Sequence, residues 1–233
     1  MDKNVIKFME QIKKTLGDNL KSFIVYGSAA TGEVYKHSDY NTLMVMETID
    51  TKALKMITRP VDGWVKKGQP IPMIFTMDSM MASQDVFPLE FLDIKENHVM
   101  LFGEDVFKKM KISSKNLRLE IERELKSKLI RLRQSFILTG GNSGKIKRLL
   151  IRSISTFVAL LKGIIRLYGK KVPAKKNEII DAAPAALKLD KELFKRILSV
   201  KEQKSDINGG EIEGVFSMYM AEMDRVADIV DKK

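Results

Sequence analysis

A short stretch near the N-terminus carries residues that could bind a phosphorylated ligand and a metal ion. Gly27 and Ser28 follow the apolar run 23–26, and Asp39 and Asn41 precede a second apolar run. Because glycine has no Cβ, backbone amides at Gly27 can approach an anion closely, and Ser28 adds a hydroxyl at the start of a helix. Asp39 and Asn41 are two residues apart where a strand begins, so their side chains are expected on one face of a sheet. The pattern predicts a phosphate-binding turn beside a carboxylate and an amide.

The two apolar runs indicate the strands that would position these residues. The first is rich in β-branched and aromatic residues and stops at Gly27, which indicates a buried strand over 21–26 that feeds a tight turn. The second, Leu43 to Met46, indicates a strand over 42–47.

This stretch resembles the nucleotidyltransferase superfamily related to DNA polymerase β, whose signature is Gly-Ser, a spacer containing a Gly, then Ser-Asp-x-Asp and an apolar strand. The residues at the expected offsets are Gly27, Ser28, Gly32, Ser38 and Asp39. The resemblance implies that the first four bind a nucleotide and that Asp39 is a catalytic residue and a metal ligand. It also implies Mg²⁺ as the cofactor and ATP or another nucleoside triphosphate as the ligand.

Asn41 departs from the family pattern, because the family has its second carboxylate at this position. In the family the paired acids hold two Mg²⁺ ions that clamp the triphosphate and activate the attacking hydroxyl. An Asn carbonyl can coordinate Mg²⁺ but brings no negative charge, and its amide cannot remove a proton. We therefore expect position 41 to stay in the catalytic site while nucleotidyl transfer is weak or lost, as in a pseudoenzyme.

The third carboxylate of the family also has no match, since the strand expected over 70–76 contains no acid. Glu47, Asp78, Glu90 and Asp93 are the remaining possibilities. In several small-molecule nucleotidyltransferases a segment like 85–94 lies near the acceptor site, so the resemblance makes Glu90 a candidate base. The alternative, which we favour, is that Glu90 caps a helix or forms a surface ion pair.

Composition restricts the classes of protein that remain. The 233 residues, 44% of them hydrophobic, suffice for one large core or two modest ones. The chain has no Cys and only two His, far apart in sequence, which excludes disulfides and thiolate sites and argues against zinc. The N-terminus does not resemble a secretory signal, and no apolar stretch approaches the roughly 20 residues that span a bilayer. We expect a cytoplasmic protein with no membrane partner.

The net charge of +11 is concentrated in one third of the chain. Between Lys111 and Lys176 there are 18 basic and three acidic residues, a balance of +15, whereas the remainder has 23 basic and 27 acidic residues. Residues 111–176 could bind RNA or another polyanion, or they could be solvated helix faces. For RNA we favour solvated faces, because no aromatic residues lie among the basic residues from 111 to 134.

Periodicity divides the chain into two domains, 1–112 and 113–233. The first is expected to contain helices over 2–16 and 51–67, the latter bent or interrupted at Pro60, with Trp64 in the core. It also contains an edge or bulged strand over 70–76 and a strand over 98–103. After Ser113 only helical stripes recur. The expected fold class is α+β, an α/β nucleotidyltransferase core with a mixed sheet, followed by an all-α helical bundle.

This architecture is similar to that of the kanamycin and other aminoglycoside nucleotidyltransferases. Aminoglycosides are cations, so the basic bundle argues against them as acceptors, and the acceptor stays open. Three interpretations follow: a nucleotide-binding protein with depleted catalysis, an active Mg²⁺-dependent enzyme that transfers a nucleoside monophosphate to a hydroxyl of a small molecule, RNA or protein, and a non-catalytic interaction protein of the toxin–antitoxin type. The residues do not predict the oligomeric state.

Overall fold

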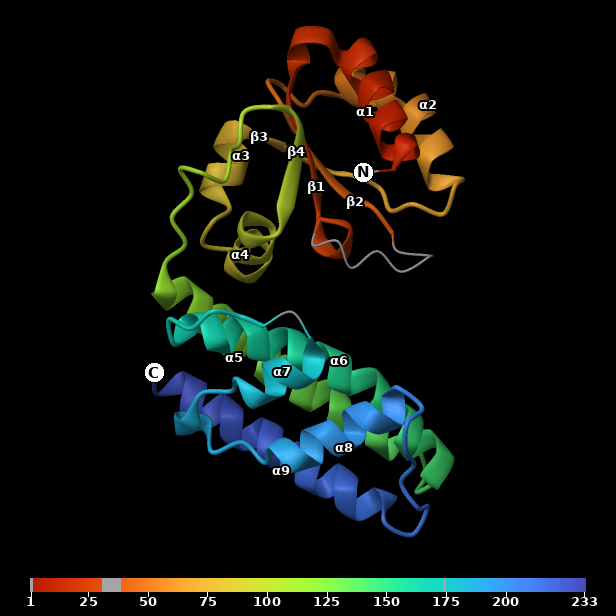
Figure 1. Cartoon of the computed structure of the whole chain (residues 1–233), viewed down its shortest axis with the longest axis vertical. Helices are drawn as coiled ribbons and strands as arrows, with labels where there is room; N and C mark the ends of the chain where they lie inside the picture. The colour runs from red at the N-terminus through yellow and green to blue at the C-terminus, as the bar shows by residue number, and fades with distance from the viewer. Residues whose placement is uncertain (1, 31–38, 174) are drawn as a thin grey trace. The chain divides into compact units, whose positions relative to one another are not determined.

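A computed structural model describes residues 2–30, 39–173 and 175–233 of the chain. It divides into two compact units (Figure 1), which we call the sheet unit, Met1–Ser113, and the helical unit, Ser114–Lys233.

The sheet unit is built on four strands in the order β3-β2-β1-β4. The strands are β1 (Leu20–Tyr26), β2 (Asn41–Met46), β3 (Met73–Thr76) and β4 (His98–Gly103). β1 pairs antiparallel with β2 and with β4, whereas β2 pairs parallel with β3. The sheet is therefore mixed, as the sequence predicted.

Helices cover both faces of this sheet (Figure 1). On one face α1 (Lys3–Leu16) and α2 (Thr51–Val65) enclose a core in which Phe8 stacks on Trp64 with 4.5 Å between ring centroids. On the other face α3 (Met77–Ala82), α4 (Pro88–Glu96) and the segment 106–110 enclose a second core around Phe91. Trp64 is 2% exposed, so the prediction that it is a core residue is confirmed.

The prolines of the sheet unit differ in their effects. α2 runs through Pro60 without a break, so the interruption expected there does not occur; the buried residues Ile57 and Trp64 on either side hold the helix against α1 despite the missing N–H. β3 begins only at Met73, after Pro70 and Pro72, and it is an edge strand as expected. Two short 3₁₀ turns, η1 (Gly17–Asn19) and η2 (Gly27–Ala29), border β1.

The helical unit contains no strand among its described residues. Its elements are α5 (Ser114–Ile137), α6 (Ser143–Leu167), α7 (Lys176–Asp181), η3 (Ala185–Leu187), α8 (Lys191–Lys201) and α9 (Ile212–Asp231). The loops end at capping residues: the Asn142 side chain accepts from the amide of Lys145, and Asp190 accepts from that of Leu193. Within the parts of the chain that are described, no helix is long and apolar enough to cross a bilayer.

α6 is the central helix of this unit. It packs against α5, α7, α8 and α9, and its apolar residues, from Ile146 to Ile165, are buried on more than one face. Phe157 stacks on Phe194 of α8 and meets Tyr219 of α9 edge to face. The apolar residues of the C-terminal half of α6, Phe157, Val158, Leu160, Leu161, Ile164 and Ile165, are thus covered within the chain.

Candidate functional site

The turn after β1 requires glycine for two reasons. Gly27 has a φ of 77°, and a Cβ at this position would lie 3.2 Å from Nδ2 of Asn41. The backbone then forms η2, closed by the amide of Ala30, which donates to the carbonyl of Gly27 at 2.9 Å. Gly27 and Asn41 are therefore immediate neighbours, and the backbone at Gly27 has no side chain of its own to exclude a ligand.

Three residues form a row across the sheet beside this turn. Tyr26 is the register partner of Asn41 on β2 and of His98 on β4. Residues directly opposite one another in antiparallel strands share a face, so the three side chains leave the sheet on the α3 and α4 side. The chain order does not reveal this row, because it depends on how distant strands pair.

Tyr26 and His98 have local partners within the row. The hydroxyl of Tyr26 donates to Sδ of Met73 at 3.0 Å, and burial raises the pKa of this phenol. Nδ1 of His98 lies 2.9 Å from the carbonyl oxygen of Ile94, and its Nε2 lies 3.3 Å from Oδ1 of Asp105. Sequence reasoning considered His98 only as a zinc ligand and missed this pairing; the single signal was its place at the start of a predicted strand.

Asp39 is exposed and comes two residues before β2. The amide of the next residue, Tyr40, donates to Oε1 of Gln69 at 2.8 Å, which fixes the backbone just before the strand. Gly32, Ser38 and the side chain of Ser28 lie outside the described residues, so their assignment to the nucleotide stays a prediction.

The candidate base Glu90 is exposed in the first turn of α4. Its neighbour Asp93 is half-buried on the same helix. Neither observation assigns a role to Glu90, which remains a candidate from the resemblance alone.

The donor set that the described residues supply does not fit a two-metal centre. None of the four strands contains an Asp or a Glu, and β3, the neighbour of β2, begins with the thioether of Met73. Among residues 2–30, 39–173 and 175–233, no three or more His, Cys, Asp or Glu side chains are grouped to hold a metal ion. What the described residues offer beside Gly27 is the amide of Asn41, with the Asp39 carboxylate nearby in sequence.

Comparisons with known proteins place the fold. No family model matches the chain, and no curated protein matches it. The solved structure of spectinomycin adenyltransferase AAD(9) from Enterococcus faecialis, with ATP and spectinomycin, is similar over 94% of this chain and 98% of its own, at 15% identity and a TM-score of 0.51. A toxin–antitoxin structure with AMP-PNP matches 54% of this chain and 94% of its own, at 13% identity and a TM-score of 0.32, too low to establish a shared fold.

The first of these likenesses covers both units and shows a nucleotidyltransferase-like fold. The fold class predicted from the sequence, an α+β core with a mixed sheet followed by a helical bundle, is confirmed.

Proposed function

We propose that this chain binds ATP or another nucleoside triphosphate in its sheet unit and that its capacity for nucleotidyl transfer is weak or absent. The phosphates would lie against the backbone that follows Gly27. Asp39 would supply the one negatively charged protein ligand to a Mg²⁺ ion that accompanies the nucleotide.

The observation that carries this proposal is the position of Asn41. It is the first residue of β2, its side chain is packed against the Gly27 turn, and it is directly opposite Tyr26 at the end of β1. The Asp39 carboxylate precedes it by two residues. The family that this stretch resembles has a second carboxylate at position 41, whereas this chain has a neutral amide there.

The charge difference decides how many cations the site can hold. Mg²⁺ prefers hard, charged oxygen ligands and retains its own waters when the protein supplies few of them. One carboxylate together with phosphate oxygens is enough for a single partly hydrated Mg²⁺. A second ion would be repelled by the first and would have no carboxylate from the strands to offset that repulsion.

The residues of this chain can nevertheless bind and orient a nucleotide. The positive φ of Gly27 and the absence of a Cβ leave its backbone open to an anion. The half-buried row of Asn41, Tyr26 and His98 has hydrogen-bonding groups on the same sheet face. Mg²⁺, when bound with the triphosphate, would neutralise phosphate charge.

The proposal is tested by titrating the full chain with ATP in a calorimeter, with and without Mg²⁺. We expect Mg²⁺ to tighten binding and Asp39→Asn to remove most of that gain, an effect of about tenfold for the loss of one charged ligand. Asp85→Asn, which removes the same charge from an exposed loop of the same unit, is the matched control and should change nothing. Absence of ATP binding at millimolar concentration would leave only an interaction protein built on this fold.

Transfer is measured separately with α-labelled ATP. We expect no label on small hydroxyl compounds, on RNA or on the chain itself above the level of the Asp39→Asn variant. Efficient labelling that Asp39→Asn abolishes would contradict the expected loss of catalysis and identify an active transferase with an unrecognised third acid.

A further inference from the structure

A groove between α5 and α6 of the helical unit is lined by five cationic side chains and by no acidic one. Two adjoining cavities of about 200 Å³ and 350 Å³ share Ser135, Leu149 and Arg152 in their walls. The cationic residues that line them are Lys128, Arg131, Lys145, Arg148 and Arg152.

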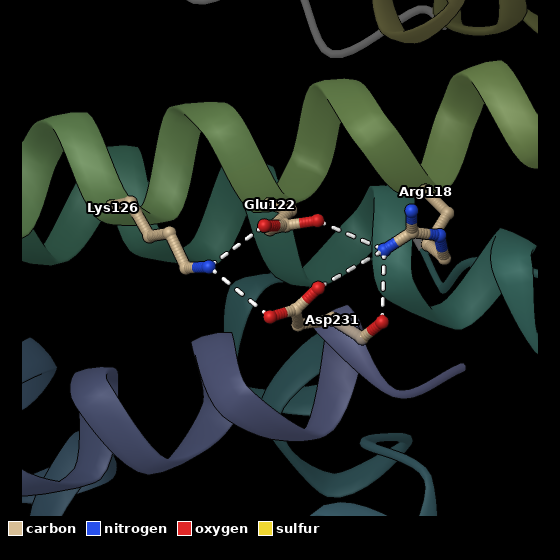
Figure 2. A network of polar contacts seen from close by, with 4 residues as sticks. All are labelled: Arg118, Glu122, Lys126 and Asp231. Atoms are coloured by element: carbon tan, nitrogen blue, oxygen red, sulfur yellow. Dashed lines mark hydrogen bonds and ion pairs between the residues drawn. The ribbon is translucent and has the colours of Figure 1, made fainter.

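Helices α5 and α9 show what paired charges look like in this unit (Figure 2). Arg118 and Lys126 of α5 share Glu122, at 2.8 and 2.7 Å, and both also contact the carboxylate of Asp231 on α9. About two turns further along α5, Arg133 pairs with Asp224 at 3.3 Å. The charges on these cations are locally offset by acids.

Four of the five groove cations lack such partners. Lys128 pairs with Glu124 at 3.1 Å, but no acidic side chain in the described part of the chain lies within ion-pair distance of the other four. The four are exposed. Because like charges this close raise one another's energy, the groove attracts an anion that the protein does not itself supply.

The distribution of the cations favours a linear anion over a compact one. On α6, positions 145, 148 and 152 recur at three and four residues, which places them on one face at intervals of about 5 Å. On α5 the lining residues run from Lys128 to Ser135, a length of about 10 Å at 1.5 Å per residue. A single phosphate group would meet only part of this row, whereas successive phosphates of a strand could meet all of it.

The remaining lining residues indicate how the anion would be held. The hydroxyls of Ser135 and Thr156 are half-buried along the groove and can donate to phosphate oxygens. The one aromatic residue of the lining, Phe157, is fully buried and stacked on Phe194, so no ring is free to stack on a base. Binding would depend on the backbone of the strand and not on its sequence.

We propose that the groove between α5 and α6 binds a single nucleic-acid strand through its phosphates, independently of base identity. This site lies wholly within the helical unit and does not depend on the nucleotide site proposed for the sheet unit. It gives a ligand to five of the 18 basic side chains in residues 111–176.

The test is fluorescence anisotropy of the full chain with short labelled oligouridylate and oligodeoxythymidylate over a range of salt concentrations. We expect both to bind, with a log–log salt slope of roughly −3 to −4 if about five phosphates are neutralised at 0.7 per contact. A triple variant should bind at least about tenfold more weakly at low salt, and the magnitude of its log–log salt slope should fall by about 2. Its substitutions are Arg131→Gln, Arg148→Gln and Arg152→Gln. Because all three residues are exposed, a circular dichroism melt should show that this variant is folded.

The matched control is a second triple variant, which removes the same total charge from exposed positions of the helical unit outside the groove: Lys115→Gln, Lys170→Gln and Lys171→Gln. We expect a loss of less than about threefold for the control, and no effect of Asp39→Asn on oligonucleotide binding. The proposal is wrong if neither oligonucleotide binds at low salt or if the control weakens binding as much as the groove variant. It is also wrong if inorganic pyrophosphate displaces the strand at equimolar concentration, because the site would then prefer a compact anion.

Discussion

Charge is distributed differently in the two units. The sheet unit has 15 basic and 15 acidic residues and is neutral overall, whereas the helical unit has 26 and 15 and carries the whole net charge of +11. In the sheet unit the proposed ligand is held by one carboxylate and an uncharged turn. In the helical unit the proposed ligand is held by five cations, of which only Lys128 is paired with an acid among the described residues. The two units thus point to two phosphate-bearing ligands that are bound by different physical means.

Backbone constraints separate the units as well. In the sheet unit, Gly27 and Gly103 have positive φ angles. A Cβ at Gly27 would lie close to the side chain of Asn41, and a Cβ at Gly103 would lie close to the backbone of Lys21. In the helical unit, Gly169 ends α6 with a φ of 67° but has open space around it. Gly27 and Gly103 are therefore needed for close approach as well as for φ, whereas Gly169 is needed for φ alone.

The largest predicted effect tests this dependence on backbone approach. A Cβ at Gly103 would lie 1.8 Å from the carbonyl oxygen of Lys21, so Gly103→Ala must displace β4 from β1 and should cost at least about 3 kcal/mol of unfolding free energy. Gly169→Ala meets only the φ penalty and should cost about 1 kcal/mol. Urea unfolding measures the loss of unfolding free energy in both variants, and equal losses would contradict the difference drawn between Gly103 and Gly169.

The next effect concerns the metal. Asn41→Asp keeps the shape of the side chain and adds a charge beside Gly27, so we expect Mn²⁺ affinity in the presence of ATP to rise about tenfold. Asn177→Asp adds the same charge at an exposed position of the helical unit and should leave the affinity unchanged. Unchanged binding by the first variant in calorimetry would count against the placement of the site.

A smaller effect compares a buried tyrosine with a half-buried one. The Tyr219 hydroxyl in the helical unit is buried without a well-formed hydrogen bond, since the nearby Ser153 hydroxyl donates to the carbonyl of Leu150, and burial raises the pKa of this phenol. We expect Tyr219→Phe to be neutral or to stabilise by up to about 1 kcal/mol. Tyr26→Phe in the sheet unit loses the bond to Met73 and should destabilise by about 0.5 to 1 kcal/mol. If thermal or urea unfolding showed that Tyr219→Phe destabilises the chain and that Tyr26→Phe stabilises it, the hydrogen bonding assigned to the two hydroxyls would be wrong.

The smallest effect is the pH dependence of the network in Figure 2. The side-chain hydrogen bond from Lys126 holds the pKa of Asp231 below its usual value, so its contribution to stability is present above the unfolded pKa of about 3.9 and is lost as pH falls through the folded pKa. Because the group is exposed, Asp231→Asn should lower Tm at pH 7 by at most about 2 °C. The difference from the unchanged chain should shrink when the melts are repeated at pH 3, and a difference that grew on acidification would contradict this sign.

Much of the fold could be predicted because local signals agree with one another. Asp2 caps α1 and Gly17 ends it, as the apolar spacing indicated, and the stripes of the C-terminal half match the buried faces of α5, α6 and α9. The interruption that the sequence allowed for at Pro60 does not occur, because packing of the flanking residues outweighs the loss of one helical hydrogen bond.

The sites were predicted less completely, for a different reason. Position 41 beside Gly27 followed from the motif, but the row with Tyr26 and His98 depends on pairing between strands far apart in sequence. Likewise, charge counting located the basic third of the chain but could not tell Lys126, which is paired with acids, from Arg131, which is not. The roles of Asp39 and Ser28 remain predictions.

The most direct test of the nucleotide site is a crystal structure of the full chain soaked with ATP and Mn²⁺, with the metal located by its anomalous signal. We expect one Mn²⁺ peak bound to Asp39 and phosphate oxygens, with the phosphates against the backbone after Gly27. Two peaks about 3.5–4 Å apart, or Asp39 directed away from the nucleotide, would contradict the proposal.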